Sequence, residues 1–220
     1  VSGCASTARH DPRDPLEGWN RGVQSFNDRL DDYFMKPVSR GYQWITPTFV
    51  DKGVTNFFNN LRDFTSAVNN LLQLKLSRAV SDVGRILVNS TVGLLGVIDV
   101  ASNLDMPSYK EDFGQTLGRW GVPPGPYIVL PLLGASTARD TVATPVDLYA
   151  SMDTQLVSGT SATVGVSVLK VVNTRANLLG ASQLLDEVAL DRYSFFRDAY
   201  LARRRSQVYD GNPPDDDENP

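Results

Sequence analysis

The clearest pattern in the chain is a stripe of apolar residues between positions 54 and 71. Its members follow one another at spacings of three and four residues: Val54, Phe57, Leu61, Phe64, Val68 and Leu71. This spacing predicts an amphipathic helix whose apolar face packs on the protein core. The same stretch holds Asn56, Asn59, Asn60, Asn69 and Asn70. Because asparagine is a poor helix former, we expect these side chains to make polar contacts that offset the lost propensity.

Helix start and stop signals recur along the chain. Asp14 is a candidate N-cap, followed by Pro15 at the first helical position and by Glu17, so a helix is expected from there to about residue 33 or 34. Pro37 is expected to begin a second short helix, which the Thr-Pro pair at 46–47 ends.

The C-terminal half has two further helical segments and one long loop. Residues 156–180 are expected to be helical, and Leu185 and Val188 begin an amphipathic pattern that ends at three arginines, 203–205. Residues 103–135 are rich in proline and glycine and predict a long ordered loop with a short hairpin around 127–130. The fold class expected is mainly α, with one domain over residues 14–205 and a disordered acidic tail over 206–220.

An apolar segment over residues 86–98 has a polar island, Asn89-Ser90-Thr91, in its middle. Thirteen residues are too few for a membrane span, which takes about 20. The island has two interpretations: it satisfies buried backbone groups, or it faces a wet cavity at membrane depth. The longest uncharged stretch, 120–138, holds four prolines, so no transmembrane helix is predicted.

Charge and composition exclude several classes of function. The chain has 21 Lys and Arg residues and 25 Asp and Glu residues. Because many of the acidic residues lie in the C-terminal tail, the rest of the chain is close to neutral. A nucleic-acid partner is therefore not expected. His10 is the only histidine and lies near the start of the chain, which argues against a Ser-His-Asp triad and a histidine metal site. Nucleotide-binding loops and a nucleophile elbow are also missing, so a non-enzyme without cofactor or metal is expected.

Cys4 is the only cysteine and closes the sequence Val-Ser-Gly-Cys. This pattern matches the end of a bacterial lipoprotein signal peptide, with residues 1–3 as its remnant, Cys4 as the lipid-anchored residue and residues 4–13 as a tether. A free thiol in a frayed terminus is the alternative.

Several motifs together resemble the MlaA/VacJ family of outer-membrane lipoproteins. They are Asp-Pro-Leu-Glu-Gly-Trp-Asn-Arg at 14–21, Phe26-Asn27, Asn56-Phe57, Asn60-Leu61, Asn69, Ile-Asp-Val-Ala at 98–101, and the glycine-rich motif at 113–134. Gln73-Leu74-Lys75 departs from the Gln-Gly turn of the family, and Arg62-Asp63-Phe64 departs from its acidic-Pro pair. The resemblance implies a ring-shaped helical protein in the periplasmic leaflet of the bacterial outer membrane, with a central channel. It further implies that phospholipids are removed from the outer leaflet and passed to the periplasmic carrier MlaC, with trimeric porins as membrane partners.

On this basis two groups of site residues are expected. Polar groups in apolar surroundings suggest a channel lining made of Phe26, Asn27, Asn89, Ser90 and Thr91. The rim or gate of the channel is expected in the long loop, at Trp120, Gly121, Gly125, Pro126, Tyr127 and Pro131. Two other classes of function remain open, namely a porin-docking scaffold lipoprotein without transport activity and a phospholipid hydrolase.

Overall fold

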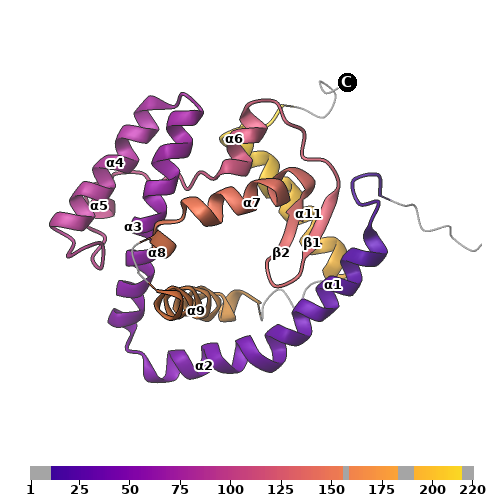
Figure 1. Cartoon of the computed structure of the whole chain (residues 1–220), viewed down its shortest axis with the longest axis horizontal. Coiled ribbons are helices and arrows are strands. Elements are labelled where there is room, and N and C mark those ends of the chain that lie inside the picture. Colours follow the sequence, from indigo (N-terminus) through magenta and orange to yellow (C-terminus); the bar gives the residue numbers. More distant parts are fainter. Residues whose placement is uncertain (1–10, 156–158, 183–190, 215–220) are drawn as a thin grey trace, which may run out of the picture.

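The computed structural model describes residues 11–155, 159–182 and 191–214, and its helices follow one another around a ring (Figure 1). The helices are α1 (Glu17–Leu30), the π-helical turn η1 (Asp31–Met35), α2 (Lys36–Ile45), α3 (Thr48–Leu72), α4 (Leu76–Thr91), α5 (Val100–Asn103), α6 (Phe113–Arg119), α7 (Ala138–Ala150), α8 (Met152–Gln155), α9 (Thr160–Asn177) and α11 (Arg192–Val208). Strands β1 (Tyr127–Leu130) and β2 (Gly134–Thr137) form an antiparallel hairpin in which Tyr127 is opposite Thr137. The expected mainly helical fold is confirmed.

The first helices join without a break, which differs from the expectation at Pro37. The π-helical turn η1 lies immediately before α2, whose second residue is Pro37. A proline ring meets the preceding helical turn, and the wider π turn at this point accommodates it. The N-cap assignment of Asp14 was also wrong. Helix α1 is preceded by Leu16 without a side-chain cap, and Asp14 is fully buried, where it accepts hydrogen bonds from Asn20 and Tyr193.

The long helices α3 and α4 pack against each other with polar side chains between them. Of the predicted apolar stripe on α3, Phe64, Val68 and Leu71 are 43%, 42% and 50% exposed, whereas Asp63 and Asn70 on the same helix are buried. The prediction that this stripe faces the core was therefore wrong. Helical periodicity shows that one face is apolar, but it does not show whether that face meets protein or another apolar medium.

Directional polar contacts hold this interior together. The Arg85 guanidinium lies 2.9 Å from the Asp63 carboxylate. Asp82 accepts hydrogen bonds from Ser66 at 2.7 Å and from Asn70 at 2.8 Å. Burial raises the pKa of the Asp63 carboxyl group and of the Asp82 carboxyl group. The expected polar contacts of the asparagines are confirmed at positions 56, 60, 69 and 70.

The loop over 103–135 is shorter than expected because it contains helix α6. Asp112 caps this helix by accepting a hydrogen bond from the Gln115 amide at 2.9 Å, and the expected hairpin follows it. Because Gly114 has no side chain, Arg204 and Asp140 can approach the backbone of α6 closely. A Cβ atom at this position would lie 2.4 Å from the Arg204 guanidinium and 2.5 Å from the Asp140 carboxylate.

The folded body extends beyond both predicted limits. Arg13 belongs to it, since its carbonyl accepts a hydrogen bond from the Tyr127 amide at 2.8 Å. At the other end, α11 continues past the three arginines to Val208, and Asp210 pairs with Lys75 at 2.6 Å. The boundaries after residues 13 and 205 were therefore placed too far inward. Cys4, Leu185, Val188 and residues 215–220 lie outside the described residues.

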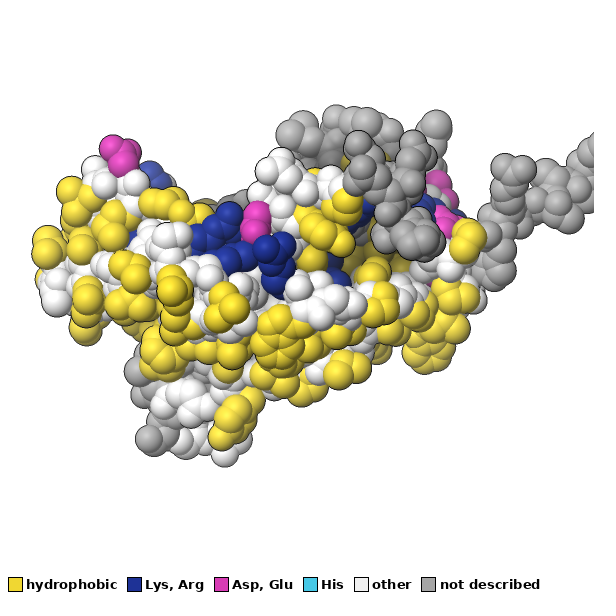
Figure 2. Space-filling model, turned by 90° about the horizontal axis from the view of Figure 1, so that it is seen from above, with side chains coloured by type: hydrophobic (Ala, Val, Ile, Leu, Met, Phe, Trp, Pro, Cys, Tyr) yellow, Lys and Arg dark blue, Asp and Glu magenta, His cyan; other side chains and the backbone are white. Residues whose placement is uncertain are grey.

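Large apolar side chains cover much of the exterior. Figure 2, which views the ring from its edge, shows hydrophobic side chains along the whole visible length of the molecule. The corner between α2 and α3 is an example, with Trp44 89%, Ile45 69% and Phe49 76% exposed. Within the described ranges, no helix combines the length and the apolar character that crossing a bilayer requires.

Candidate functional site

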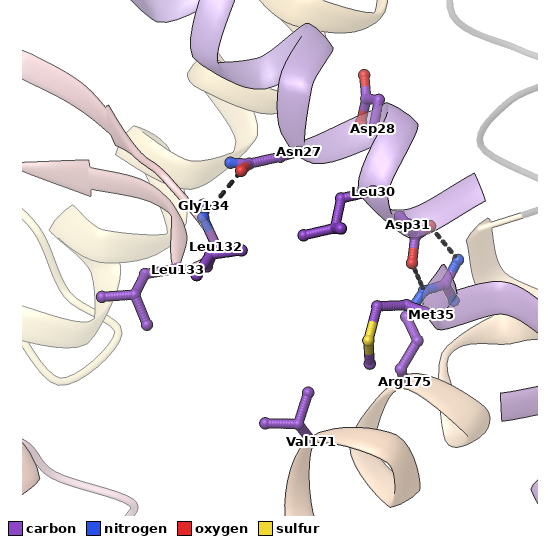
Figure 3. A pocket seen from close by; sticks show the side chains of 10 residues that line it. All are labelled: Asn27, Asp28, Leu30, Asp31, Met35, Leu132, Leu133, Gly134, Val171 and Arg175. Atoms are coloured by element: carbon purple, nitrogen blue, oxygen red, sulfur yellow. Dashed lines mark hydrogen bonds and ion pairs between the residues drawn. The ribbon is translucent and has the colours of Figure 1, made fainter. Parts of the chain in front are cut away.

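A pocket of about 280 Å³ lies between α1, η1, the turn of the hairpin and α9. Residues from α1, η1, the hairpin turn and α9 line it (Figure 3): Asn27, Asp28, Leu30, Asp31, Met35, Leu132, Leu133, Gly134, Val171 and Arg175. The lining is of two kinds. Leu30, Met35 and Val171 point toward a common apolar space, and charged groups lie along one side of it. Such a pocket can hold a ligand that is itself part apolar and part charged.

The charged side of the pocket is built around one ion pair. The Arg175 guanidinium on α9 donates from Nε to one oxygen of Asp31 at 2.6 Å and from Nη2 to the other oxygen at 2.8 Å. This two-point contact joins η1 to α9 across the pocket wall (Figure 3). Asp28 lies 3.6 Å from Arg192, and burial raises the pKa of its carboxyl group.

The opposite side of the pocket is the turn of the β-hairpin. Leu132 and Leu133 at its tip are 71% and 61% exposed, and Leu132 has a positive φ of 67°, which is unusual for leucine. Asn27 holds this tip with two hydrogen bonds, donating to the Leu130 carbonyl at 3.0 Å and accepting from the Leu132 amide at 2.8 Å. The position of the hairpin tip beside the pocket therefore depends on one amide side chain of α1.

Asn20 makes the same kind of contact seven residues earlier on α1. Its amide donates to the Tyr127 carbonyl at 3.0 Å and accepts from the Val129 amide at 2.8 Å. The side-chain amides of Asn20 and Asn27 thus make the hydrogen bonds that a neighbouring strand would make along the open edge of β1, and in this sense they are a substitute strand. A spacing of seven residues keeps both side chains on one face of α1, which explains why the two asparagines recur at this distance.

The structure does not bring the predicted channel residues together. Asn27 lines the pocket, but Phe26, which is 53% exposed, does not. Asn89 is buried between α4 and α5, where it donates to Asp99 at 3.1 Å and accepts from the Ala101 amide at 2.8 Å. Ser90 accepts from Asn60, and Thr91 bonds the backbone of its own helix. The polar island thus satisfies local groups, which is the first of the two interpretations that the sequence left open.

The predicted rim residues also lie off the pocket lining. Trp120 is 55% exposed and donates to the Leu72 carbonyl at 3.1 Å, while Gly121 and Gly125 have positive φ and shape the turns that lead to β1. Pro126 precedes β1, and Pro131 is exposed beside the tip. Tyr127 is only 1% exposed and packs on Tyr193 and Tyr200 in the small apolar core, and burial raises its pKa to about 12. A rim position for Tyr127 was therefore wrong.

Sequence reasoning missed most of the pocket lining. The two leucines of the hairpin tip belong to the motif at 113–134, but their apolar side chains give no sign in the sequence that they line a pocket. Asp31 and Arg175 are 144 positions apart, so only the fold pairs them. Among the described residues, no cluster of His, Cys, Asp and Glu side chains could bind a metal ion.

Comparison with known proteins agrees with this architecture. The family model of the MlaA lipoprotein matches residues 12–207. The chain is 34% identical to the intermembrane phospholipid transport system lipoprotein MlaA of Escherichia coli, over 99% of this chain and 88% of that protein. It is also 34% identical to the protein of the same name from Haemophilus influenzae, over 96% and 87% of the two chains.

A solved structure is similar throughout. It was described as a structural basis for maintenance of bacterial outer membrane lipid asymmetry, and it matches with a TM-score of 0.72 and 32% identity, over 90% of this chain and 99% of the other. The extent of these matches and the shared fold show that the chain belongs to the MlaA lipoprotein family.

Proposed function

We propose that the protein is a lipoprotein of the bacterial outer membrane that removes phospholipids from the outer leaflet through the centre of its ring and passes them to a periplasmic carrier. It acts as a transporter and not as an enzyme, and Cys4 carries its lipid anchor. Membership of the MlaA family supports the proposal, since the relatives from Escherichia coli and Haemophilus influenzae are named for intermembrane phospholipid transport.

The observation that carries the proposal is the mixed lining of the pocket between η1, the hairpin turn and α9. Moving a phospholipid headgroup through hydrocarbon strips a charged group of its partners, at a cost of several kcal/mol. The ion pair of Asp31 and Arg175 lies beside Leu30, Met35 and Val171, so headgroup and acyl chains each find a matching surface. Because the lipid moves down a gradient, this chain needs no nucleotide site.

The apolar exterior supports residence within one leaflet. Side chains such as Trp44 and Phe49 are costly to expose to water but favourable in the acyl region of a membrane. A ring held in the periplasmic leaflet has its opening directed toward the periplasm, where MlaC collects the lipid. Trimeric porins are the proposed membrane partners, because the exterior of the ring offers an extended apolar surface to a second membrane protein.

The proposal is tested by filling the pocket. Val171→Trp adds an indole to the apolar wall, and Val80→Trp is the matched control because Val80 is 72% exposed on α4 and does not line the pocket. Lipids that co-purify with each variant in mild detergent are identified by mass spectrometry, and outer-leaflet phospholipid is measured in cells.

We expect phospholipid on the wild type and on Val80→Trp, less on Val171→Trp, and a raised outer-leaflet phospholipid content only for Val171→Trp. Porin binding by a wild type that carries no phospholipid would instead favour a docking scaffold. Release of free fatty acid from labelled lipid would favour a hydrolase.

A further inference from the structure

The ion pair between Asp31 and Arg175 lies beside an aliphatic pocket wall, unlike two other close ion pairs of the fold. Arg85 and Asp63 are buried between α3 and α4, with side chains 4% and 2% exposed. Arg21 and Asp191 line a second pocket, in which the remaining lining residues are polar or tyrosine, without an aliphatic wall. Arg175 and Asp31, with side chains 15% and 24% exposed, lie on the wall of the pocket. Of the arginines in the described ranges, Arg175 alone is in the lining of this pocket.

An arginine in this geometry can exchange its carboxylate partner for a phosphate. The guanidinium presents parallel N–H donors that match two oxygens of either anion. In the structure Asp31 occupies this two-point site, at 2.6 and 2.8 Å. Asp31 has a second cation nearby, since Lys36 Nζ, which pairs with Asp32 at 2.6 Å, lies 3.9 Å from the Asp31 oxygen that Arg175 Nη2 binds. The carboxylate would therefore keep a positive partner when it releases Arg175.

The backbone at Asp31 also differs from that of the flanking helices. Asp31 is the first residue of η1, and π-helical turns inside a longer helix occur frequently at functional sites. The wider turn places Asp31 and Met35, a charged and an apolar lining residue, at the two ends of one short segment. A small change in this turn would alter both kinds of contact.

The face of α9 that bears Arg175 shows which class of phosphate compound fits. Val164, Val168, Val171 and Arg175 follow at spacings of four, three and four residues and so form one line along the helix. Val164, Val168 and Val171 are 56%, 54% and 54% exposed. Three apolar side chains that lead to one arginine match an acyl chain attached to a phosphate, whereas a free phosphate gains nothing from the valines.

We propose that Arg175 is the phosphate-binding residue of the pocket and that Asp31 is a competing internal anion, which the phosphodiester of a lipid displaces. This inference rests on the proposed function and adds to it the specificity-determining group. Recognition is then of the phosphate that all phospholipids share, and a lipid that lacks phosphate leaves the ion pair closed. The closed pair keeps the arginine satisfied when no lipid is present, which avoids an unpaired charge on a partly apolar wall.

The test compares two lipids with the same acyl chains, dioleoyl phosphatidylethanolamine and dioleoylglycerol. Fluorescent forms of both are titrated into the full protein in mild detergent, and the ratio of their dissociation constants is the phosphate preference. We expect the wild type to prefer the phospholipid by about tenfold or more, as for a lost charged hydrogen bond. Arg175→Gln should bring the ratio close to one and leave dioleoylglycerol binding unchanged.

Two further variants distinguish phosphate binding from a structural effect. Asp31→Asn removes the competing charge and keeps Arg175, so it should bind the phospholipid several times more tightly than the wild type does. Lys170→Gln is the matched control because it removes one cation of α9, paired with Asp153 at 2.8 Å, which does not line the pocket. Its preference should equal that of the wild type.

The possible outcomes separate the two proposals. An unchanged preference in Arg175→Gln, or weaker phospholipid binding by Asp31→Asn, would overturn the role of Arg175 and leave lipid transport intact. If the wild type binds neither lipid, the proposed function fails. Soluble glycerophosphoethanolamine serves as a competitor, and competition as strong as that of the lipid would show a site for free phosphate esters and overturn the assignment to lipid.

Discussion

Replacement of Asn20 by alanine tests the idea that α1 supplies a substitute strand to the hairpin. Asn20 is fully buried and makes three hydrogen bonds, to the Tyr127 carbonyl, the Val129 amide and the Asp14 carboxylate. Alanine leaves two buried backbone groups without partners and removes one donor from a buried charge. At about 1–3 kcal/mol for each of the two unsatisfied backbone groups, the expected loss is about 2–6 kcal/mol. This approaches the whole stability of an ordinary domain, about 5–15 kcal/mol.

Asn27→Ala is the control, because it removes the same pair of backbone contacts at a more exposed position. Water can replace the side chain at the Leu132 amide, since Leu132 is 71% exposed, so the expected loss is about 1 kcal/mol. Urea unfolding in mild detergent, followed by circular dichroism, measures both variants. Equal losses for the two variants would refute the substitute-strand argument, as would a loss below about 1 kcal/mol for Asn20→Ala.

Three other substitutions test single features of the fold. Asp147 accepts a hydrogen bond from the Phe113 amide at 2.9 Å, and burial, strengthened by nearby carboxylates, raises its pKa to about 6 from the usual 3.8. A raised carboxyl pKa means that the folded state holds the proton more tightly than the unfolded state does, so the free energy of unfolding falls as pH rises from about 4 to 6. Asp147→Asn should remove this fall. After allowance for solvent screening, the substitution should stabilise the protein by about 1–2 kcal/mol at pH 7.5. Unfolding curves at pH 5 and 7.5 check this, and an unchanged pH dependence contradicts it. Gly114→Ala should lower the unfolding temperature by several degrees, because its Cβ would lie 2.4 Å from Arg204, whereas Gly18→Ala, with no atom within 4 Å of its Cβ, should not. Leu74 has a φ of 60° and is 84% exposed, so Leu74→Gly should stabilise the protein by about 0.5–1 kcal/mol in urea unfolding, and a loss of stability would contradict the strain argument.

Local patterns in the sequence predicted most elements of the fold. The helix over 54–71, the hairpin around 127–130 and the final helix depend on spacing and turn residues, which act over short distances along the chain. Helix α6 was missed because its seven residues lie between stretches rich in glycine and proline. Its cap, Asp112, is a recognisable start signal, but the segment is too short for a periodic pattern to show.

The candidate site was harder to predict, because its members come from distant parts of the chain. Asn27 was expected at the site and lines the pocket. Asn89 was expected there for the same reason, a polar group in apolar surroundings, but its partners Asp99 and Ala101 are nearby in the sequence. Polarity alone thus identifies a residue that needs partners, and only the fold shows whether those partners are the protein or a ligand.

The reversed polarity of α3 and α4 has a consequence for how the chain can vary. An interior such as that of Asp63, Arg85 and Asn70 depends on the direction and number of hydrogen bonds, so each position accepts few replacements. The outer face, with Val68 and Leu71, is exposed, and under the proposed function it meets the acyl chains of a membrane, which need no complementary shape. A saturation library of the two helices should therefore tolerate any aliphatic or aromatic residue outside and almost none inside. That is the reverse of the tolerance of a water-soluble domain, in which the surface varies freely among polar residues and the interior among apolar ones.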